Sequence, residues 1–360
     1  MKSALVVLAA AVVLASGAST QATPAEKSIS VMTRNLYIGG DLSPLVTAST
    51  PAQFLSAVHT MLAQMTATNF PERAESLASE IVERKPHLVS LQEVYRVTLN
   101  GATGAQPYRD LLDDLLTALA TQGAEYRVVA QIQNLNATIP VPGVGIVQAT
   151  DRDVIIARSD VTTSIVNVPG CRASRDGCNF QVFVALASPL GPINIERGFV
   201  VVDAQTPTGA IRFVNTHLEI PELPLTVQAA QAAELVATLD GLPNPSLRPV
   251  IIAGDINSAP TDVPSIVNGQ TIVSPYLQFA AAGYADAWTL RPGQSAGLTC
   301  CQAPNLLNGE SQLFKRVDVI LTNLIPHRVQ AHVVGRDDDD RTPSGLWPSD
   351  HAGVVARFFF

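Results

Sequence analysis

The sequence feature that most constrains the fold of this chain is a series of short β-prone runs, several of which end in or beside a polar residue. The second half of the sequence is rich in them, and one strong helical pattern, residues 225–241, interrupts the series. Strands with helices scattered between them predict mixed sheets flanked by helices in one domain. The runs expected to be strands are 28–36, 87–94, 125–131, 153–158, 180–187, 198–204, 211–217, 249–254, 316–322 and 352–359, and the helices expected in the first half are 52–67, 72–85 and 108–121.

The composition allows a sizeable core. Hydrophobic residues make up 47% of the chain and charged residues 15%, which excludes wholesale disorder. The net charge of −8 argues against bulk electrostatic binding of nucleic acid, although a local basic groove or a bound metal can override net charge.

The first residues have the pattern of an export signal. Lys2 gives a positive start, residues 4–15 form an apolar run, and small residues follow up to Ala18. The run is shorter than the roughly 20 residues that a membrane span needs. We therefore expect a signal peptide at 1–22, cleaved after Ala18 or Ala22, and one domain at 28–360. The protein is expected to be secreted or periplasmic, without a transmembrane anchor.

The four cysteines form two close pairs, Cys171 with Cys178 and Cys300 with Cys301. In an exported protein they should be oxidised. Three connectivities are possible, and we favour a bridge within each pair, while cross-pairing remains open. Zinc binding is disfavoured because neither pair has zinc-ligand spacing with a nearby histidine.

Polar side chains end several of the expected strands, where an apolar pattern stops. Rigid strand ends and loops are the usual places for catalytic groups. Carboxylate and amide oxygens suit a hard cation such as Mg²⁺, histidines move protons near neutral pH, and a cation offsets charge on a phosphoryl group. The residues in these positions are Asn35, Glu93, His217, Asp255, Asn257, Asp318, Asp350 and His351.

The order and context of these residues resemble the endonuclease/exonuclease/phosphatase superfamily, as a DNase-I-like secreted bacterial-type member. The resembling stretches are RNL, LQEV, NTHLE, AGDIN, RVDVI and SDHAGVVA, spread over residues 34–356. The resemblance implies an α/β (α+β) fold, a four-layer α/β/β/α sandwich in which two mixed β-sheets pack face to face and the helices lie outside. Loops near 138–150, 171–178, 258–276 and 291–312 are expected to crowd one end and to shape the pocket.

The resemblance also implies a role for each residue. Glu93 would be the principal metal ligand, with Asn35 beside it, and Asp350 a further metal or water ligand. Asp255 would orient the attacking water or a metal, and Asn257 would touch the phosphate. His351 would be the general base oriented by Asp318, and His217 would stabilise the phosphate or protonate the leaving oxygen. Asp318 could instead form a structural salt bridge with Arg316.

The implied enzyme is a metal-dependent phosphoric ester hydrolase that attacks a phosphodiester in line with water, using Mg²⁺, or alternatively Mn²⁺ or Ca²⁺. Its substrate would be a nucleic acid or a phospholipid headgroup. We expect a nuclease-type enzyme; the alternatives are a sphingomyelinase-like phospholipase C, an inositol-polyphosphate-type phosphatase and a catalytically decayed binding protein. No stable protein partner is implied, and the chain is expected to be a monomer.

One position departs from the family pattern. Many members carry an acidic residue two positions after the first-strand asparagine, where this chain has Tyr37. Asp41, in the turn that follows, could substitute for it. The number of metal ions at the site, one or two, therefore stays open.

Overall fold

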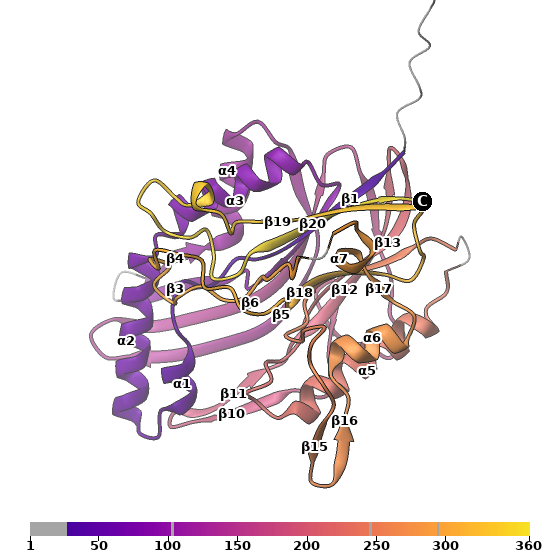
Figure 1. The fold of residues 1–360 in the computed structure, drawn as a ribbon. Coiled ribbons are helices and arrows are strands. Elements are labelled where there is room, and N and C mark those ends of the chain that lie inside the picture. Colours follow the sequence, from indigo (N-terminus) through magenta and orange to yellow (C-terminus); the bar gives the residue numbers. More distant parts are fainter. Residues whose placement is uncertain (1–26, 102–103, 245–246, 294) are drawn as a thin grey trace, which may run out of the picture.

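The computed structural model describes residues 27–360 except 102–103, 245–246 and 294, so the expected signal peptide at 1–22 lies outside the described residues. The described chain forms two large β-sheets packed face to face, with helices on the outer faces (Figure 1). The predicted four-layer sandwich is thereby confirmed.

The first sheet has eight strands in the order β19–β20–β1–β2–β6–β3–β4, with β5 also paired to β6. Only the pair β1–β2 is parallel. The strands are β1 Ile29–Asn35, β2 Leu88–Gln92, β3 Arg96–Gly101, β4 Gly104–Asp110, β5 Tyr126–Val141, β6 Gly145–Arg158, β19 Arg328–Val334 and β20 Gly353–Phe359.

The second sheet also has eight strands, in the order β17–β18–β14–β13–β12–β9–β8, with β7 paired to β12. Here too one pair, β13–β14, is parallel. The strands are β7 Thr162–Ile165, β8 Arg172–Ser174, β9 Gly177–Asn179, β12 Gly198–Thr206, β13 Gly209–His217, β14 Val250–Asp255, β17 Ala285–Asp286 and β18 Asp318–Thr322.

Apolar side chains fill three layers between these elements. Val31, Phe213 and Ile251 belong to the layer between the two sheets. The helices α2 (Pro51–Ala67), α3 (Phe70–Arg84) and α4 (Leu111–Thr121) cover the outer face of the first sheet, and α5 (Leu225–Gly241) and α6 (Pro275–Ala281) cover the second. Strands buried on both faces are apolar almost throughout, which explains why the runs were visible in the sequence. The short helices are α1 (Ser43–Thr47), α7 (Ala287–Leu290) and a 3₁₀ turn at Asp338–Asp340.

A small polar network joins the two sheets inside the central apolar layer. Gln92 Nε2 on β2 donates to Asn215 Oδ1 on β13 at 2.9 Å, and Asn215 Nδ2 donates to the carbonyl oxygens of Leu91 and Val154 at 3.0 Å. Ser90 Oγ donates to the Ala253 carbonyl at 2.7 Å. Because buried polar groups are costly unless paired, this network fixes how one sheet lies over the other.

The expectation of a loop at 138–150 is wrong, because β5 and β6 continue through it. Ile139 pairs with Val147, and only residues 142–144 form the turn. Pro140 marked this segment as a loop, yet it lies in β5, which pairs on one side only and therefore tolerates a proline.

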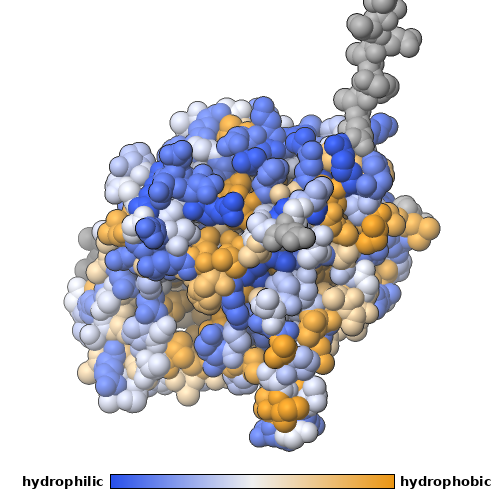
Figure 2. Space-filling view, viewed as in Figure 1, coloured by the Kyte–Doolittle hydropathy of each residue, from blue (hydrophilic) through white to orange (hydrophobic). Residues whose placement is uncertain are grey.

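Two further hairpins stand outside the main sheets. β10 (Val184–Ser188) and β11 (Gly191–Ile195) pair only with each other, as do β15 (Ser265–Val267) and β16 (Gln270–Ile272). The second hairpin lies within the loop expected at 258–276 and projects from the body, with hydrophobic side chains gathered on it (Figure 2). Ile266 at this hairpin is 69% exposed.

The cysteines pair as favoured, Cys171 with Cys178 and Cys300 with Cys301. The first bridge closes the short β8–β9 hairpin. Within the described part of the chain, no helix combines the length and the hydropathy that a bilayer crossing requires.

Candidate active site

Strand register brings the predicted polar residues to one end of the sandwich. In the parallel pair β1–β2, Asn35 lies opposite Gln92, so Glu93 follows at the same end. In the parallel pair β13–β14, His217 lies opposite Asp255, and Asp255 in turn lies opposite Asp318 on β18. The segment before β20 adds Asp350 and His351.

Asp318 and His351 form the tightest contact of the site. Asp318 Oδ2 lies 2.8 Å from His351 Nδ1, and both side chains are buried. The Thr299 hydroxyl accepts hydrogen bonds from the backbone N–H groups of Val317 and Asp318 at 3.1 and 3.2 Å. These contacts fix the orientation of the imidazole ring, which is the role of the carboxylate in a carboxylate–histidine pair.

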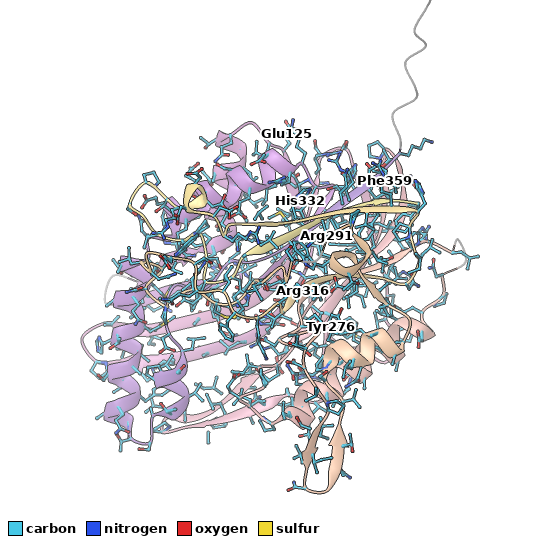
Figure 3. The ribbon with its side chains drawn as sticks, in the orientation of Figure 1. Glu125, Tyr276, Arg291, Arg316, His332 and Phe359 are labelled. Atoms are coloured by element: carbon cyan, nitrogen blue, oxygen red, sulfur yellow. A yellow bond between two sulfur atoms is a disulfide. The ribbon has the colours of Figure 1, made fainter. Side chains whose placement is uncertain are left out.

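The alternative salt bridge between Asp318 and Arg316 is not formed. Arg316 pairs with Asp286 instead, and Tyr276 donates its hydroxyl to the same carboxylate at 3.0 Å. Figure 3 labels Arg316 and Tyr276. Arg316 is thus held by Asp286, while Asp318 contacts His351.

Asp255 lies at the centre of the site. Its Oδ2 atom is 3.6 Å from His351 Nδ1, 3.6 Å from His217 Nε2 and 3.3 Å from Asn35 Nδ2. Its Oδ1 atom accepts a hydrogen bond from the Asn257 backbone N–H at 2.9 Å. Burial and the neighbouring Asp318 raise the pKa of Asp255 to about 6, against the opposite effect of His351.

The two histidines have pKa values shifted in opposite directions. Burial disfavours a charged imidazole, yet Asp318, Asp255 and Asp350 together raise the pKa of His351 well above its usual range. For His217, burial and the positive charges of Arg197 and His351 lower the pKa well below its usual range. These surroundings therefore favour the neutral form of His217 and the charged form of His351.

Glu93, Asn35 and Asp350 form the second half of the constellation. Glu93 has a left-handed backbone with φ of +52°, a conformation that is rare outside glycine and recurs at functional sites. Its carboxylate accepts from Asn35 Nδ2 at 3.1 Å and from the Ile38 backbone N–H at 3.4 Å. Ser349 Oγ donates to the Asn35 carbonyl at 2.9 Å, which ties the Asp350 segment to the end of β1.

The donor set fits a divalent cation. Ligand atoms of Asp255, Asp318 and His351 all lie within 4.8 Å of one another. Burial and Glu93 raise the pKa of Asp350 to about 7, although His351 lowers it. Buried carboxylates that resist ionisation are groups that a cation stabilises, and oxygen donors suit Mg²⁺, Mn²⁺ or Ca²⁺. Asn35 directs its amide nitrogen toward Glu93, so its oxygen can join a metal only after the amide turns over.

Asn257 lies at the edge of this group. Its side-chain Nδ2 donates to the Leu218 carbonyl at 3.0 Å, and its backbone has φ of +49°. One of its two amide protons is thus already used to join the ends of β13 and β14.

Tyr37 and Asp41 do not replace the missing acidic ligand. The Tyr37 hydroxyl donates to the Pro304 carbonyl at 3.0 Å. Asp41 Oδ1 accepts from the Ser43 backbone N–H at 2.8 Å, where α1 begins. Both side chains therefore have local structural partners.

A second buried charge cluster, not predicted from the sequence, lies beside His217. Arg197 Nη1 lies 2.9 Å from His217 Nδ1, and Arg197 Nη2 pairs with Glu219 at 3.3 Å. Asp151 and Asp153 on β6 are also buried here, at 3.9 Å from Arg197 and His217 respectively. Burial raises the pKa of Asp151 to about 7 and that of Asp153 well above its usual range, with Asp151 adding to the second shift.

A signal for this cluster existed in the sequence. Asp151 and Asp153 lie two positions apart just before the apolar run 154–157, and residues at i and i+2 of a strand share one face. Both oxygens of Asp153 are buried without a hydrogen bond of normal geometry. Asn134, at an irregularity of β5 between Gln133 and Leu135, is buried in the same way.

A four-layer sandwich with this acidic, histidine-containing end defines the DNase-I-like class of proteins. The chain belongs to the Endonuclease/Exonuclease/phosphatase family, whose family model matches residues 60–351. Members of this family are generally phosphoester hydrolases and typically depend on divalent metals. A comparison with curated protein sequences finds no match.

Solved structures share the fold at low sequence identity. A family protein from Leptotrichia buccalis has a TM-score of 0.54 and 16% identity, over 92% of this chain and 100% of that one. A family protein from Beutenbergia cavernae has a TM-score of 0.53 and 19% identity, over 93% and 72%. Truncated Caenorhabditis elegans TDP2 has a TM-score of 0.50 and 16% identity, over 92% and 98%. At these identities the likeness concerns the fold alone.

Proposed function

We propose that this protein hydrolyses phosphodiesters by in-line attack of water with the help of a divalent cation. The observation that carries the proposal is the Asp318–His351 contact of 2.8 Å, placed beside Asp255 where the ends of β1, β2, β13 and β14 meet. A carboxylate-oriented imidazole next to further carboxylates is suited to moving a proton from water at a phosphoryl group.

His351 is the proposed general base, and Asp318 is its positioning residue. The carboxylate holds Nδ1 and stabilises the imidazolium that forms when Nε2 takes a proton. Asp255 lies beside the same ring and orients the attacking water. A divalent cation held here would supply positive charge for the phosphoryl group and would offset the charges of Asp255 and Asp350, which act to raise the pKa of His351.

The cation would be held by Glu93, Asp350 and Asp255, with Asn35 joining through its amide oxygen. Mg²⁺ is the proposed ion because it binds through one or two carboxylates and the substrate phosphate. His217, which is kept neutral by Arg197, hydrogen-bonds a phosphate oxygen or the leaving oxygen. Asn257 contributes its remaining amide proton to the phosphate.

We also propose that the protein works in an oxidising compartment, secreted or periplasmic, as one catalytic domain at 28–360 and as a monomer. The Cys171–Cys178 and Cys300–Cys301 bridges support the oxidising compartment, since disulfides persist outside the reducing cytosol. Intact-mass measurement of the exported protein checks both the bridges and the cleavage of residues 1–22.

The test of the function is a metal-by-substrate panel. The protein is stripped with EDTA and then assayed with Mg²⁺, Mn²⁺ or Ca²⁺ on bis(p-nitrophenyl) phosphate, plasmid DNA, RNA, sphingomyelin and an inositol phosphate. We expect hydrolysis that EDTA abolishes and that one of these metals restores. If no phosphoester is cleaved with any of them, the chain is a binding protein with a decayed site and the proposal is wrong.

A further inference from the structure

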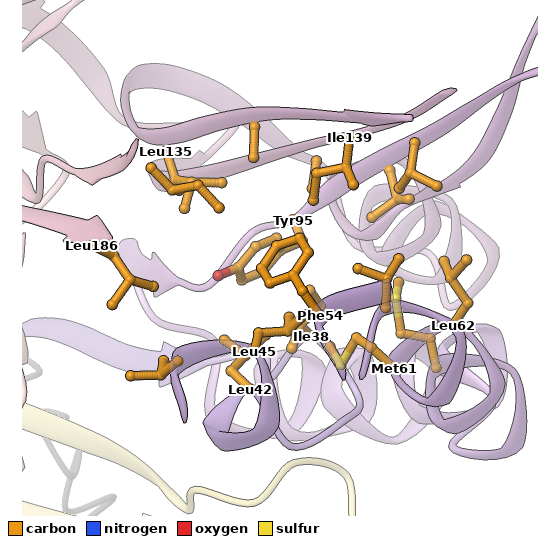
Figure 4. Close-up of a pocket in the computed structure, with 18 of the residues that line it drawn as sticks. Ile38, Leu42, Leu45, Phe54, Met61, Leu62, Tyr95, Leu135, Ile139 and Leu186 are labelled. Atoms are coloured by element: carbon orange, nitrogen blue, oxygen red, sulfur yellow. The ribbon is translucent and has the colours of Figure 1, made fainter. Parts of the chain in front are cut away.

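Figure 4 shows an apolar cavity of about 130 Å³. Its lining includes Ile38, whose backbone N–H donates to Glu93 of the candidate site. Its walls come from α1, α2, β5, β6 and the β10–β11 hairpin, and all of the lining side chains except Tyr95 are hydrocarbon or thioether. Protein interiors are close-packed, so a hollow of this size among described core residues is unusual. Apolar cavities of about 150 Å³ stay dry and bind molecules as large as benzene.

The cavity exists because two small side chains lie in the wall that β5 and β6 form. Ala137 on β5 lies directly opposite Ala149 on β6, and both line the cavity. Ile139 and Val147, the next pair on the same face, also line it. Larger side chains at the two alanine positions would close the space.

The cavity and the polar site share the same chain segments. Three of those segments supply a buried polar residue and, two positions away, a residue that lines the cavity: Glu93 of the site with Tyr95, and Asp151 and Arg197 of the cluster beside His217 with Ala149 and Ile195. Ile38, another lining residue, donates its backbone N–H to Glu93 at 3.4 Å. The hydrocarbon walls therefore begin next to a proposed metal ligand.

The cavity reaches the surface beneath α1. None of the residues of this five-residue helix is buried, and Leu42, which precedes it and lines the cavity, is 36% exposed. The opposite wall is the β10–β11 hairpin, which pairs with neither large sheet. Two walls are thus made of elements with few ties to the core, which gives a ligand a way in.

The charges around the site do not favour a nucleic acid strand. Polyanion binding draws on cations that are available to phosphates. Four arginines near the site or near the charge cluster beside His217 are each paired with a carboxylate: Arg34 with Glu80, Arg152 with Asp110, Arg197 with Glu219 and Arg316 with Asp286. The chain as a whole carries a net charge of −8.

We infer that the cavity takes the hydrocarbon chain of an amphiphilic phosphoester whose phosphate lies at the Glu93–His351 site. This inference rests on the proposed function and narrows its substrate class to alkyl or acyl phosphodiesters. A pocket with apolar walls and a polar group at one end is the usual form of a small-molecule site. Tyr95 supplies that polar group, since every other side chain that lines the cavity is hydrocarbon or thioether.

The first experiment is a chain-length series of p-nitrophenyl alkyl phosphodiesters with methyl, butyl and octyl groups, assayed below their micelle concentrations with the activating metal. Each buried methylene is worth up to about fourfold in kcat/KM. We expect kcat/KM to rise from methyl to octyl by at least about tenfold, and to level off once the cavity is filled. A flat series means that the cavity is only a packing void.

A matched pair of variants separates the effect of filling the cavity from the effect of adding a phenylalanine elsewhere. Ala137→Phe fills the hollow, whereas Ala185→Phe makes the same change on β10 at an exposed position. We expect Ala137→Phe to cleave the methyl ester like the parent protein but to lose the preference for octyl, and Ala185→Phe to keep it. Loss of the preference in both variants, or in neither, overturns the inference, as does a plasmid-DNA kcat/KM above that of the octyl ester.

A binding measurement keeps this inference distinct from the proposed function. Octylphosphonic acid and methylphosphonic acid have carbon–phosphorus bonds that hydrolysis does not cleave, and calorimetry gives their affinities without turnover. We expect the octyl compound to bind at least about tenfold more tightly, with a negative heat-capacity change that Ala137→Phe removes. If nothing is hydrolysed but this difference holds, the proposed function fails and the hydrocarbon site stands. If diesters are hydrolysed and the two compounds bind equally, the function stands and the hydrocarbon site fails.

Discussion

His351 and His217 lie on either side of Asp255 Oδ2, each with a ring nitrogen 3.6 Å from it, in very different surroundings. His351 precedes a strand of the first sheet and faces three carboxylates, Asp318, Asp255 and Asp350. His217 ends a strand of the second sheet and contacts the guanidinium of Arg197. The pKa of the first is raised and that of the second is lowered.

The difference shows how one residue type fills two roles in one site. A pair of titratable groups whose pKa values are pushed apart separates proton-carrying work from neutral hydrogen bonding. The sign of each shift comes from the charges that face each ring, carboxylates for His351 and the Arg197 guanidinium for His217, because both rings are buried to a similar degree. We expect single substitutions in and around the two histidines to have the following effects, in order of decreasing free-energy change.

Replacing His351 should have the largest effect. His351→Ala removes the proposed base, and we expect kcat/KM to fall by about 10³–10⁴-fold in a phosphodiesterase assay, with the fold retained by circular dichroism. The control is His332→Ala on β19, which changes an exposed histidine (Figure 3). Near-normal activity of His351→Ala would remove this residue from the mechanism.

Replacing Arg197 should have the next largest effect, on stability. Arg197→Met leaves Glu219 and Asp151 buried without their cation, which should lower the free energy of unfolding by about 3–5 kcal/mol in urea titrations. Arg357→Met, at an exposed position of β20, is the control. If the two variants unfold at the same urea concentration, Arg197 does not stabilise the His217 side as described.

Replacing Glu93 should change the metal requirement. Glu93→Gln keeps the shape but removes the charge, and we expect the metal concentration for half-maximal activity to rise by about 10–100-fold. The control is Glu125→Gln, which changes an exposed glutamate (Figure 3). An unchanged metal titration would contradict a ligand role for Glu93.

Replacing a third histidine, His87, should have the smallest effect on the free energy of unfolding. It serves as a reference for His351 and His217. Burial and Arg158 lower the pKa of His87 to about 4, and its Nδ1 accepts from the Ser30 backbone N–H at 3.0 Å. Because the folded-state pKa is below the usual 6.5, His87 stabilises the fold fully above about pH 6.5, and this contribution is lost as the pH falls toward 4. Allowing for partial solvent screening, we expect a loss of about 1–2 kcal/mol.

The measurement compares unfolding free energies of the parent protein and His87→Asn at pH 7 and pH 4. Asparagine keeps an acceptor for Ser30 but does not titrate. We expect the loss between the two pH values to be smaller in the variant, while activity at pH 7 is unchanged. Parallel pH curves would show that His87 contributes nothing to acid sensitivity.

Much of the candidate site could be predicted from the sequence, because several of its residues lie where apolar runs end. Asn35, Glu93 and Asp255 each follow a strand that is buried on both faces, so the change from apolar to polar is visible in the letters alone. The two-sheet layout was inferred from the family resemblance, since periodicity does not tell which strands pair.

The buried charge cluster around Arg197 and the apolar cavity were not predicted, because both depend on how the strands pair. Asp153 lies inside a long strand beside Arg152, and alternating charges in a strand suggest a solvent-exposed edge. The cavity depends on the pairing of Ala137 with Ala149, which register decides and composition does not. Features that depend on the strand register between distant segments cannot be predicted from local sequence alone.

The polar network between the sheets has a consequence for refolding. His351 comes from one sheet and His217 from the other, and Gln92, Asn215 and Ser90 fix the two sheets in one relative position. A slip of one residue along a strand is about 3.3 Å, enough to separate every contact made by Asp255. Recovery of phosphodiesterase activity after dilution from urea should therefore follow the docking of the sheets, and should lag behind the far-ultraviolet signal that reports strand formation within each of them.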